Sequence, residues 1–143
     1  MTCTILIKNN ITPIGKQLIK NFIFFCKKKL DIQNLPNKIT IFNKRNEETG
    51  MTTGGYDPET HDIMVLGGSR MLLDVLRSIA HELTHHKQNE RGELIEMVAM
   101  YESDIDTPYE NEAYERAGNL IKEWTRLIKD KNPEIYSMYC VEH

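Results

Sequence analysis

The sequence contains few cysteines and no long apolar stretch, and both absences narrow the class of protein. Its three cysteines, Cys3, Cys26 and Cys140, are too few and too scattered for a disulfide framework, and they form no C-x-x-C pair of the kind that a zinc ribbon requires. The apolar run Phe22–Cys26 is far shorter than the roughly 20 residues of a membrane-spanning helix. The N-terminus has no apolar segment long enough for a signal peptide. We therefore expect a cytoplasmic protein with no membrane partner.

The sequence also lacks an excess of basic residues. Its formal net charge is −3 and its pI is about 6.0, whereas domains that bind nucleic acid usually have a basic face or a high pI. We therefore expect no nucleic-acid partner. With 143 residues, of which 40% are hydrophobic, the chain is long enough for one domain with its own core. The prediction is a single domain over residues 1–143, with its core at about 38–130.

Local patterns predict strands early in the chain and helices late. Runs of β-branched and apolar residues predict strands at Thr4–Lys8, Lys38–Phe42 and Asp62–Leu66. Apolar residues at helical spacing predict helices from Thr12-Pro13 to about Leu30, from Met71 to about Asn89, over Glu93–Glu102, and from Tyr109 to about Lys129. The polar stretch Asn43–Gly55 is expected to be a loop, followed by a turn at Tyr56–Thr60. This order favours an α+β fold with a small three-stranded sheet.

The segment His81-Glu82-Leu83-Thr84-His85 lies in the middle of a predicted helix and has the pattern H-E-x-x-H. Residues four apart share one helix face, so His81 and His85 can bind one Zn²⁺ through their imidazole nitrogens. Glu82 lies about 100° around the helix from His81, where its carboxylate can reach a zinc-bound water without being a ligand. The pattern predicts that this water attacks a peptide carbonyl, with Glu82 as the general base.

The identity of the third metal ligand decides the subclass, because a catalytic zinc ion normally has three protein ligands and one open position. The pattern H-E-x-x-H-x-x-G-x-x-H is excluded, because Gln88 occupies the glycine position and Arg91 the third histidine position. After His86 no histidine follows until His143, so we expect a carboxylate. The best candidate is Glu112, which opens the last long helix.

At this point the sequence resembles the gluzincins, which are zinc peptidases with H-E-x-x-H and a downstream glutamate ligand. Asn111-Glu112-Ala113 looks like the N-E-x-x-S/D segment of the thermolysin-like members, although Glu115-Arg116 stands where the Ser/Asp pair is expected. The resemblance covers roughly Gly54 to Trp124, and the chain is similar in style to small single-domain chains of phages and bacteria that are assigned as metallopeptidases. It implies a zincin-like fold in which the last long helix carries the third ligand. By motif position it implies zinc ligands at His81, His85 and Glu112, and the base at Glu82.

Weaker candidates surround the motif. Glu115 lies one turn beyond Glu112 and could accept a hydrogen bond from a zinc-bound histidine. Tyr109 is a candidate oxyanion stabiliser, and the alternatives are Tyr101, Tyr114 and His86. The resemblance also implies an edge strand that pairs with an extended substrate, for which the candidates are the strand Asp62–Leu66 and the approach to it, Gly54, Gly55 and Tyr56. Residues of these types are also common on ordinary helix surfaces and in hairpins.

Two functions are consistent with this pattern. The first is a zinc-dependent metallopeptidase acting on a peptide or protein substrate. The alternative is a non-catalytic, zinc-stabilised binding module on the same fold. Glu82 favours catalysis, because a structural zinc site needs no general base and tends to close its fourth position. A DNA-repair type of zincin is disfavoured, because this acidic chain has neither a basic module nor a zinc ribbon.

Overall fold

The computed structural model describes residues 3–7, 11–43, 53–68, 70–93 and 108–140. These residues form an α+β fold, as expected, with the element order β1 (Thr4–Ile7), α1 (Pro13–Lys29), β2 (Lys38–Phe42), β3 (Gly54–Asp57), β4 (Asp62–Leu66), α2 (Leu72–Glu90), α4 (Pro108–Lys131) and α5 (Pro133–Tyr139). The helix predicted for Glu93–Glu102 lies almost entirely outside the described residues. None of the helices in the described part of the chain is long and apolar enough to cross a membrane.

The sheet has four strands, not the three that the sequence predicts. Its order is β1-β2-β4-β3, with β1, β2 and β4 parallel and β3 antiparallel to β4. The additional strand begins at Gly54-Gly55, which has little intrinsic strand preference. It forms because it pairs with β4, with Gly54 opposite Val65 and Tyr56 opposite Ile63. Pairing with a neighbour, rather than local sequence, therefore makes β3 a strand.

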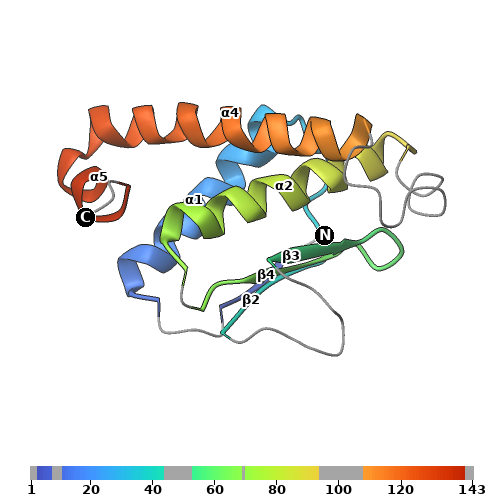
Figure 1. Ribbon diagram of the computed structural model, residues 1–143. Helices are drawn as coiled ribbons and strands as arrows, with labels where there is room; N and C mark the ends of the chain where they lie inside the picture. The colour runs from blue at the N-terminus through green and yellow to red at the C-terminus, as the bar shows by residue number, and fades with distance from the viewer. Residues whose placement is uncertain (1–2, 8–10, 44–52, 69, 94–107, 141–143) are drawn as a thin grey trace.

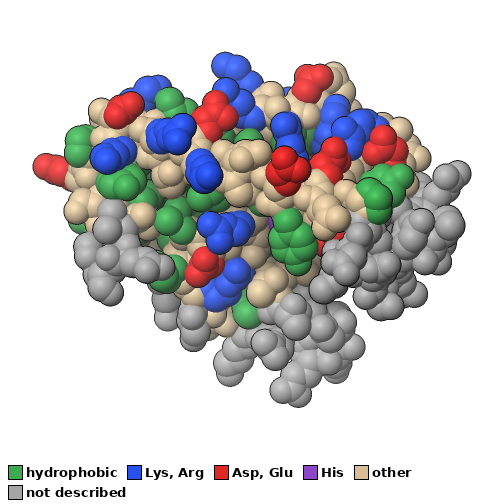
Figure 2. Space-filling view, turned by 45° about the horizontal axis from the view of Figure 1, so that its top comes forward, with side chains coloured by type: hydrophobic (Ala, Val, Ile, Leu, Met, Phe, Trp, Pro, Cys, Tyr) green, Lys and Arg blue, Asp and Glu red, His purple; other side chains and the backbone are tan. Residues whose placement is uncertain are grey.

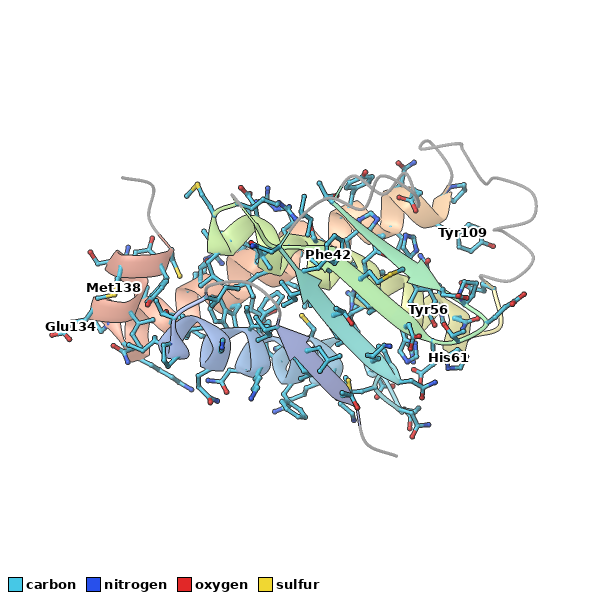
Figure 3. All side chains as sticks on the ribbon, turned by 90° about the horizontal axis from the view of Figure 1, so that it is seen from below. Phe42, Tyr56, His61, Tyr109, Glu134 and Met138 are labelled. Carbon is cyan, nitrogen blue, oxygen red and sulfur yellow. The ribbon has the colours of Figure 1, made fainter. Side chains whose placement is uncertain are left out.

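The added strand changes which strands lie at the edges of the sheet. The strand at Asp62–Leu66, expected to be an edge, is β4 and lies between β2 and β3. The edges are β1 and β3. A tight turn joins β3 to β4, in which Asp57 Oδ1 accepts hydrogen bonds from the backbone N–H groups of Glu59 at 2.9 Å and Thr60 at 3.3 Å. Figure 3 shows Tyr56 and His61, on either side of this turn, at the same end of the sheet.

Helices α1 and α2 lie on one face of the sheet, and α4 lies across them on the side away from the sheet (Figure 1). Alternate residues of the central strands point to the helices and are fully buried: Ile39, Ile41, Ile63 and Val65. Phe22 of α1 packs edge-to-face on Trp124 of α4, with ring centroids 5.4 Å apart. Helices α2 and α4 run antiparallel to each other along their length (Figure 1). The middle helix α2 is therefore enclosed by the sheet on one side and by α4 on the other.

The first long helix begins where the sequence predicts. Thr12 caps α1, because its side chain accepts a hydrogen bond from the backbone N–H of Gly15 at 3.0 Å, and Pro13 follows at the first helical position. The last turn carries Lys27, Lys28 and Lys29, whose charges favour a helix C-terminus. Local signals of this kind are sufficient to place a helix end.

Candidate metal centre

Two opposite faces of α2 have different roles. Ile79, Ala80 and Leu83 are fully buried in the core. His81 and His85 face α4, and their rings lie 4.8 Å apart. The four-residue spacing places them one turn apart on the same face, as the sequence predicts. The side chain of His85 is 8% exposed and that of His81 is 14% exposed, so both imidazoles lie at the junction of two helices rather than on an open surface.

A carboxylate from α4 completes a group of three possible metal ligands. Glu110 Oε1 lies 2.7 Å from His85 Nε2, and Glu110 Oε2 lies 3.1 Å from His81 Nε2. The three ligand atoms all lie within 4.8 Å of one another. Glu110 belongs to the first turn of α4, where the helix dipole favours a negative charge. The group His81, His85 and Glu110 could therefore hold a metal ion.

The charges of the three residues are strongly coupled. Hydrogen bonds from His81 and His85 lower the pKa of Glu110 well below its usual range, although burial acts in the opposite direction. Burial by itself lowers the pKa of His85, but the hydrogen bond to Glu110 and the nearby charge of Glu82 outweigh it, so the net pKa is raised. The cluster therefore favours an ionised carboxylate beside the imidazoles.

The donor set suits a divalent transition metal. Two imidazole nitrogens and one carboxylate oxygen are the ligands of many catalytic zinc sites, which leave a fourth position open. Tetrahedral coordination with bonds of about 2.0–2.2 Å places neighbouring ligand atoms roughly 3.3 Å apart. The contacts of Glu110 with the two histidines, at 2.7 and 3.1 Å, are somewhat shorter than that. The largest separation within the group is at most 4.8 Å, so the two imidazoles would approach each other around an ion. The donor types present fit the group.

Glu82 is buried beside this cluster, and it has no polar partner among the described residues. Its relative exposure is 7%, and no described residue forms a hydrogen bond or ion pair with its carboxylate. Burial raises the pKa of Glu82, whereas the positive charges of His85 and His81 act to lower it. A buried carboxylate without a partner is costly. Such a group next to possible metal ligands is typical of a functional site.

Glu112, the ligand expected from the sequence, is not part of the group. Its Oε1 accepts hydrogen bonds from Gln88 Nε2 at 2.8 Å and from Arg91 Nη2 at 2.7 Å. Partial burial acts to raise the pKa of Glu112, but these two hydrogen bonds outweigh it and the net pKa is lowered. Glu110 and Glu112 are two residues apart on a helix and so point about 160° away from each other. Only one of them can face the histidines, and it is Glu110.

The hydrogen-bond partner of His85 also differs from the expectation. Gln88 Oε1 lies 2.8 Å from His85 Nδ1, in the position for which Glu115 was a candidate from the sequence. The side chain of Glu115 is exposed on α4. Gln88 lies three residues after His85 and therefore one turn along the same helix face. That spacing is the sequence signal that could have identified it.

The candidate oxyanion stabilisers do not all lie beside the histidine cluster. The ring of Tyr114 lies 4.5 Å from that of His81, although the residue is 60% exposed. Tyr109 contributes its backbone oxygen, which accepts a hydrogen bond from Gln88 Nε2 at 3.0 Å, and its hydroxyl bonds to no described residue. Tyr101 lies outside the described residues. Tyr114 is thus the tyrosine that borders the histidine cluster.

His86 faces away from the cluster, as expected from its position on the helix. Its Nε2 lies 2.6 Å from the carbonyl oxygen of Asn34, so this nitrogen carries the hydrogen. Its Nδ1 accepts a hydrogen bond from the Tyr56 hydroxyl at 2.8 Å, and Asn89 Nδ2 in turn donates to that hydroxyl at 2.9 Å. Burial lowers the pKa of His86, which suits the neutral ring. This network ties β3 to α2.

The candidates Gly54, Gly55 and Tyr56 all belong to β3. Gly54 lies against Glu82, because a Cβ atom at Gly54 would be 3.5 Å from Glu82 Oε1. Within the described residues β3 pairs with β4 alone. An edge strand of the described sheet therefore lies next to the buried glutamate. The predicted three-stranded sheet did not include this strand.

The surface over α4 has no concentration of one charge. Figure 2 shows this face, with acidic and basic side chains interspersed among apolar ones. Comparisons with models of protein families, with curated proteins and with solved structures found no match for this chain.

Proposed function

We propose that this chain is a zinc-dependent metallopeptidase of the gluzincin type, in which His81, His85 and Glu110 hold the metal ion. The observation that carries the proposal is the Glu82 carboxylate, which is buried beside this group and forms no hydrogen bond or ion pair with any described residue. A metal site that serves only to stabilise a fold needs no such carboxylate. Glu82 therefore favours catalysis over a non-catalytic binding module.

Each residue has a distinct role in the proposed reaction. When bound, a zinc ion lowers the pKa of water and polarises the carbonyl of a substrate. Glu82 accepts a proton from the water that attacks the peptide carbonyl, and it then delivers this proton to the leaving nitrogen. The ring of Tyr114, beside His81, is positioned to contact the substrate where it enters.

Strand β3 pairs with no described strand other than β4, and this edge position supports a peptide as the substrate. An extended peptide can add to an exposed sheet edge through main-chain hydrogen bonds. Because Gly54 of β3 lies next to Glu82, a peptide paired with this edge would bring one of its carbonyl groups close to the base. The absence of a side chain at Gly54 leaves room for this approach.

The test compares bound zinc and peptide cleavage in the wild type and in Glu82→Gln. Zinc is measured by elemental analysis, and cleavage with a mixture of quenched fluorescent peptides. We expect Glu82→Gln to keep its zinc and to lose cleavage by roughly 10²- to 10⁴-fold, the usual contribution of a general base. The matched control is Glu134→Gln, which makes the same change on the exposed surface of α5, at the other end of the molecule from Tyr56 (Figure 3).

The other outcomes are equally informative. If the wild type binds zinc but neither protein cleaves any peptide, the non-catalytic binding module replaces the peptidase. Equal cleavage by the wild type and Glu82→Gln would remove Glu82 from the mechanism. A wild type that binds no zinc would contradict the metal site itself.

A further inference from the structure

Gln88 is a buried polar residue that the proposed reaction does not use. It lies on α2, and none of its surface is exposed. Burying an amide costs free energy unless its donors and acceptor are all paired. A methionine or leucine would fill the same space without that cost. The contacts of the Gln88 amide must therefore offset the cost of burying it.

One end of the Gln88 amide orients a metal-ligating histidine. Its Nε2 faces two acceptors, the Tyr109 carbonyl oxygen at 3.0 Å and Glu112 Oε1 at 2.8 Å, and this fixes which way the amide points. Its Oε1 therefore faces His85 Nδ1 at 2.8 Å. Because a carbonyl oxygen can only accept, Nδ1 of His85 carries the hydrogen. Without a metal ion, Nε2 also carries a hydrogen and donates it to Glu110 Oε1 at 2.7 Å. When the ring loses that hydrogen to bind a metal ion, the lone pair is on Nε2.

The other end of the amide holds the turn that carries the third ligand. Tyr109 and Glu112, its two acceptors, lie on either side of Glu110 in the first turn of α4. Glu112 is in turn held by Arg91 of the α2 C-cap at 2.7 Å. A single buried side chain thus connects a ligand on α2 to the backbone next to a ligand on α4.

We propose that Gln88 is a positioning residue for the metal centre, which sets the tautomer of His85 and the place of Glu110 at the same time. The proposal rests on the metal binding proposed above. Partners of metal-bound histidines typically change metal affinity by about 10- to 100-fold when they are removed. We expect an effect in that range for Gln88, because its amide acts on two ligands rather than one.

The test measures zinc affinity by competition with a chelator in the full chain. Gln88→Met keeps the volume of the side chain but removes the amide, and we expect it to bind zinc about 10- to 100-fold more weakly. Gln88→Glu places a second carboxylate against Glu112 and the Tyr109 carbonyl, with no donor between them, so it too should bind zinc more weakly. Gln17→Met, which changes an exposed glutamine of α1, is the matched control.

Exchanging the side chains at positions 88 and 112 distinguishes a positioning role of Gln88 from a role in packing alone. In the double variant Gln88→Glu/Glu112→Gln, the new carboxylate accepts from His85 and from the amide at position 112, so the connection between the helices is restored. Arg91 then keeps its ion pair with Glu93 at 3.2 Å. We expect the double variant to recover most of the affinity that Gln88→Glu loses. The absorption spectrum of the Co²⁺-loaded protein should return towards that of the wild type in parallel.

Thermal unfolding of each metal-free variant shows whether it folds. Wild-type affinity in Gln88→Met, or a double variant that binds zinc no better than Gln88→Glu, would overturn the positioning role while leaving the metal site intact. A wild type that binds no metal would overturn both proposals. The two failures are therefore distinguishable.

Discussion

The backbone of Gly54 lies directly against the side chain of Glu82. A Cβ atom at Gly54 would be 3.5 Å from both Cγ and Oε1 of Glu82 and 3.2 Å from the carbonyl oxygen of Met64. The first two distances are ordinary contacts, whereas the third is tight. A methyl group at position 54 would therefore be in van der Waals contact with the proposed base.

A larger residue at this position should impair cleavage without removing the metal. In Gly54→Val the two methyl groups would displace Glu82 or the edge of β3, and a displacement of about 1 Å from productive geometry can cost roughly a hundredfold in rate. We expect zinc affinity to stay close to that of the wild type, because the atoms nearest to a Cβ at position 54 belong to Met64 and Glu82 and not to a proposed metal ligand. Gly54→Ala should show a smaller loss. Full activity in Gly54→Val would mean that β3 does not line the substrate site.

The two glutamates at the start of α4 should differ in their effect on metal binding. Glu110→Gln removes a proposed ligand, and we expect its zinc affinity to fall by more than the roughly 10- to 100-fold that is typical of a partner outside the ligand set. Glu112→Gln retains an oxygen that can accept from Gln88, so its loss should be smaller. Chelator competition measures both. The opposite ranking would restore Glu112 as the third ligand.

Two glycines allow the free energy of unfolding to be changed without touching the site. Gly118 lies inside α4, and a Cβ atom there would meet no atom within 4 Å. Gly118→Ala should therefore stabilise the fold by about 0.5–1 kcal/mol, through helix propensity and a less flexible unfolded chain. The measurement is urea unfolding followed by the fluorescence of Trp124, which is the one tryptophan in the sequence and is 3% exposed.

An alanine at Gly92 should have the opposite effect on the free energy of unfolding. Its φ angle is +79°, in the left-handed region that side chains other than glycine rarely adopt. Gly92→Ala should therefore destabilise the fold by roughly 1 kcal/mol or more, even though a Cβ atom there has open space. Similar stabilities for the two alanine variants would contradict the backbone geometry at one of these positions.

The choice between Glu110 and Glu112 shows how much of the candidate site can be predicted from the sequence. The buried face of α4 includes Ala113 and Ala117, and Glu110 lies three and seven residues before them, so all three share one stripe. Glu112 lies about 100° away from Ala113. The similarity of Asn111-Glu112-Ala113 to a known ligand segment pointed to Glu112, whereas the angular position of the buried stripe points to Glu110, the glutamate that lies beside the histidines.

Local signals in the sequence were enough to predict three strands, the long helices and the placement of His81, Glu82 and His85 on one of them. A helix sets the relative positions of residues one to four apart, and this geometry needs no information from elsewhere in the chain. The α+β class follows from the same local patterns. Whether the chain cleaves peptides stays a prediction.

Only the tertiary structure decided the features that join separate elements. Strand β3 exists because Gly54–Asp57 pairs with β4, and its edge reaches Glu82 because α2 packs on that side of the sheet. Glu110 meets the histidines, and Gln88 connects His85 to α4, because the two helices lie antiparallel in contact. These contacts depend on packing between residues far apart in the chain, which the local periodicity of each element does not contain.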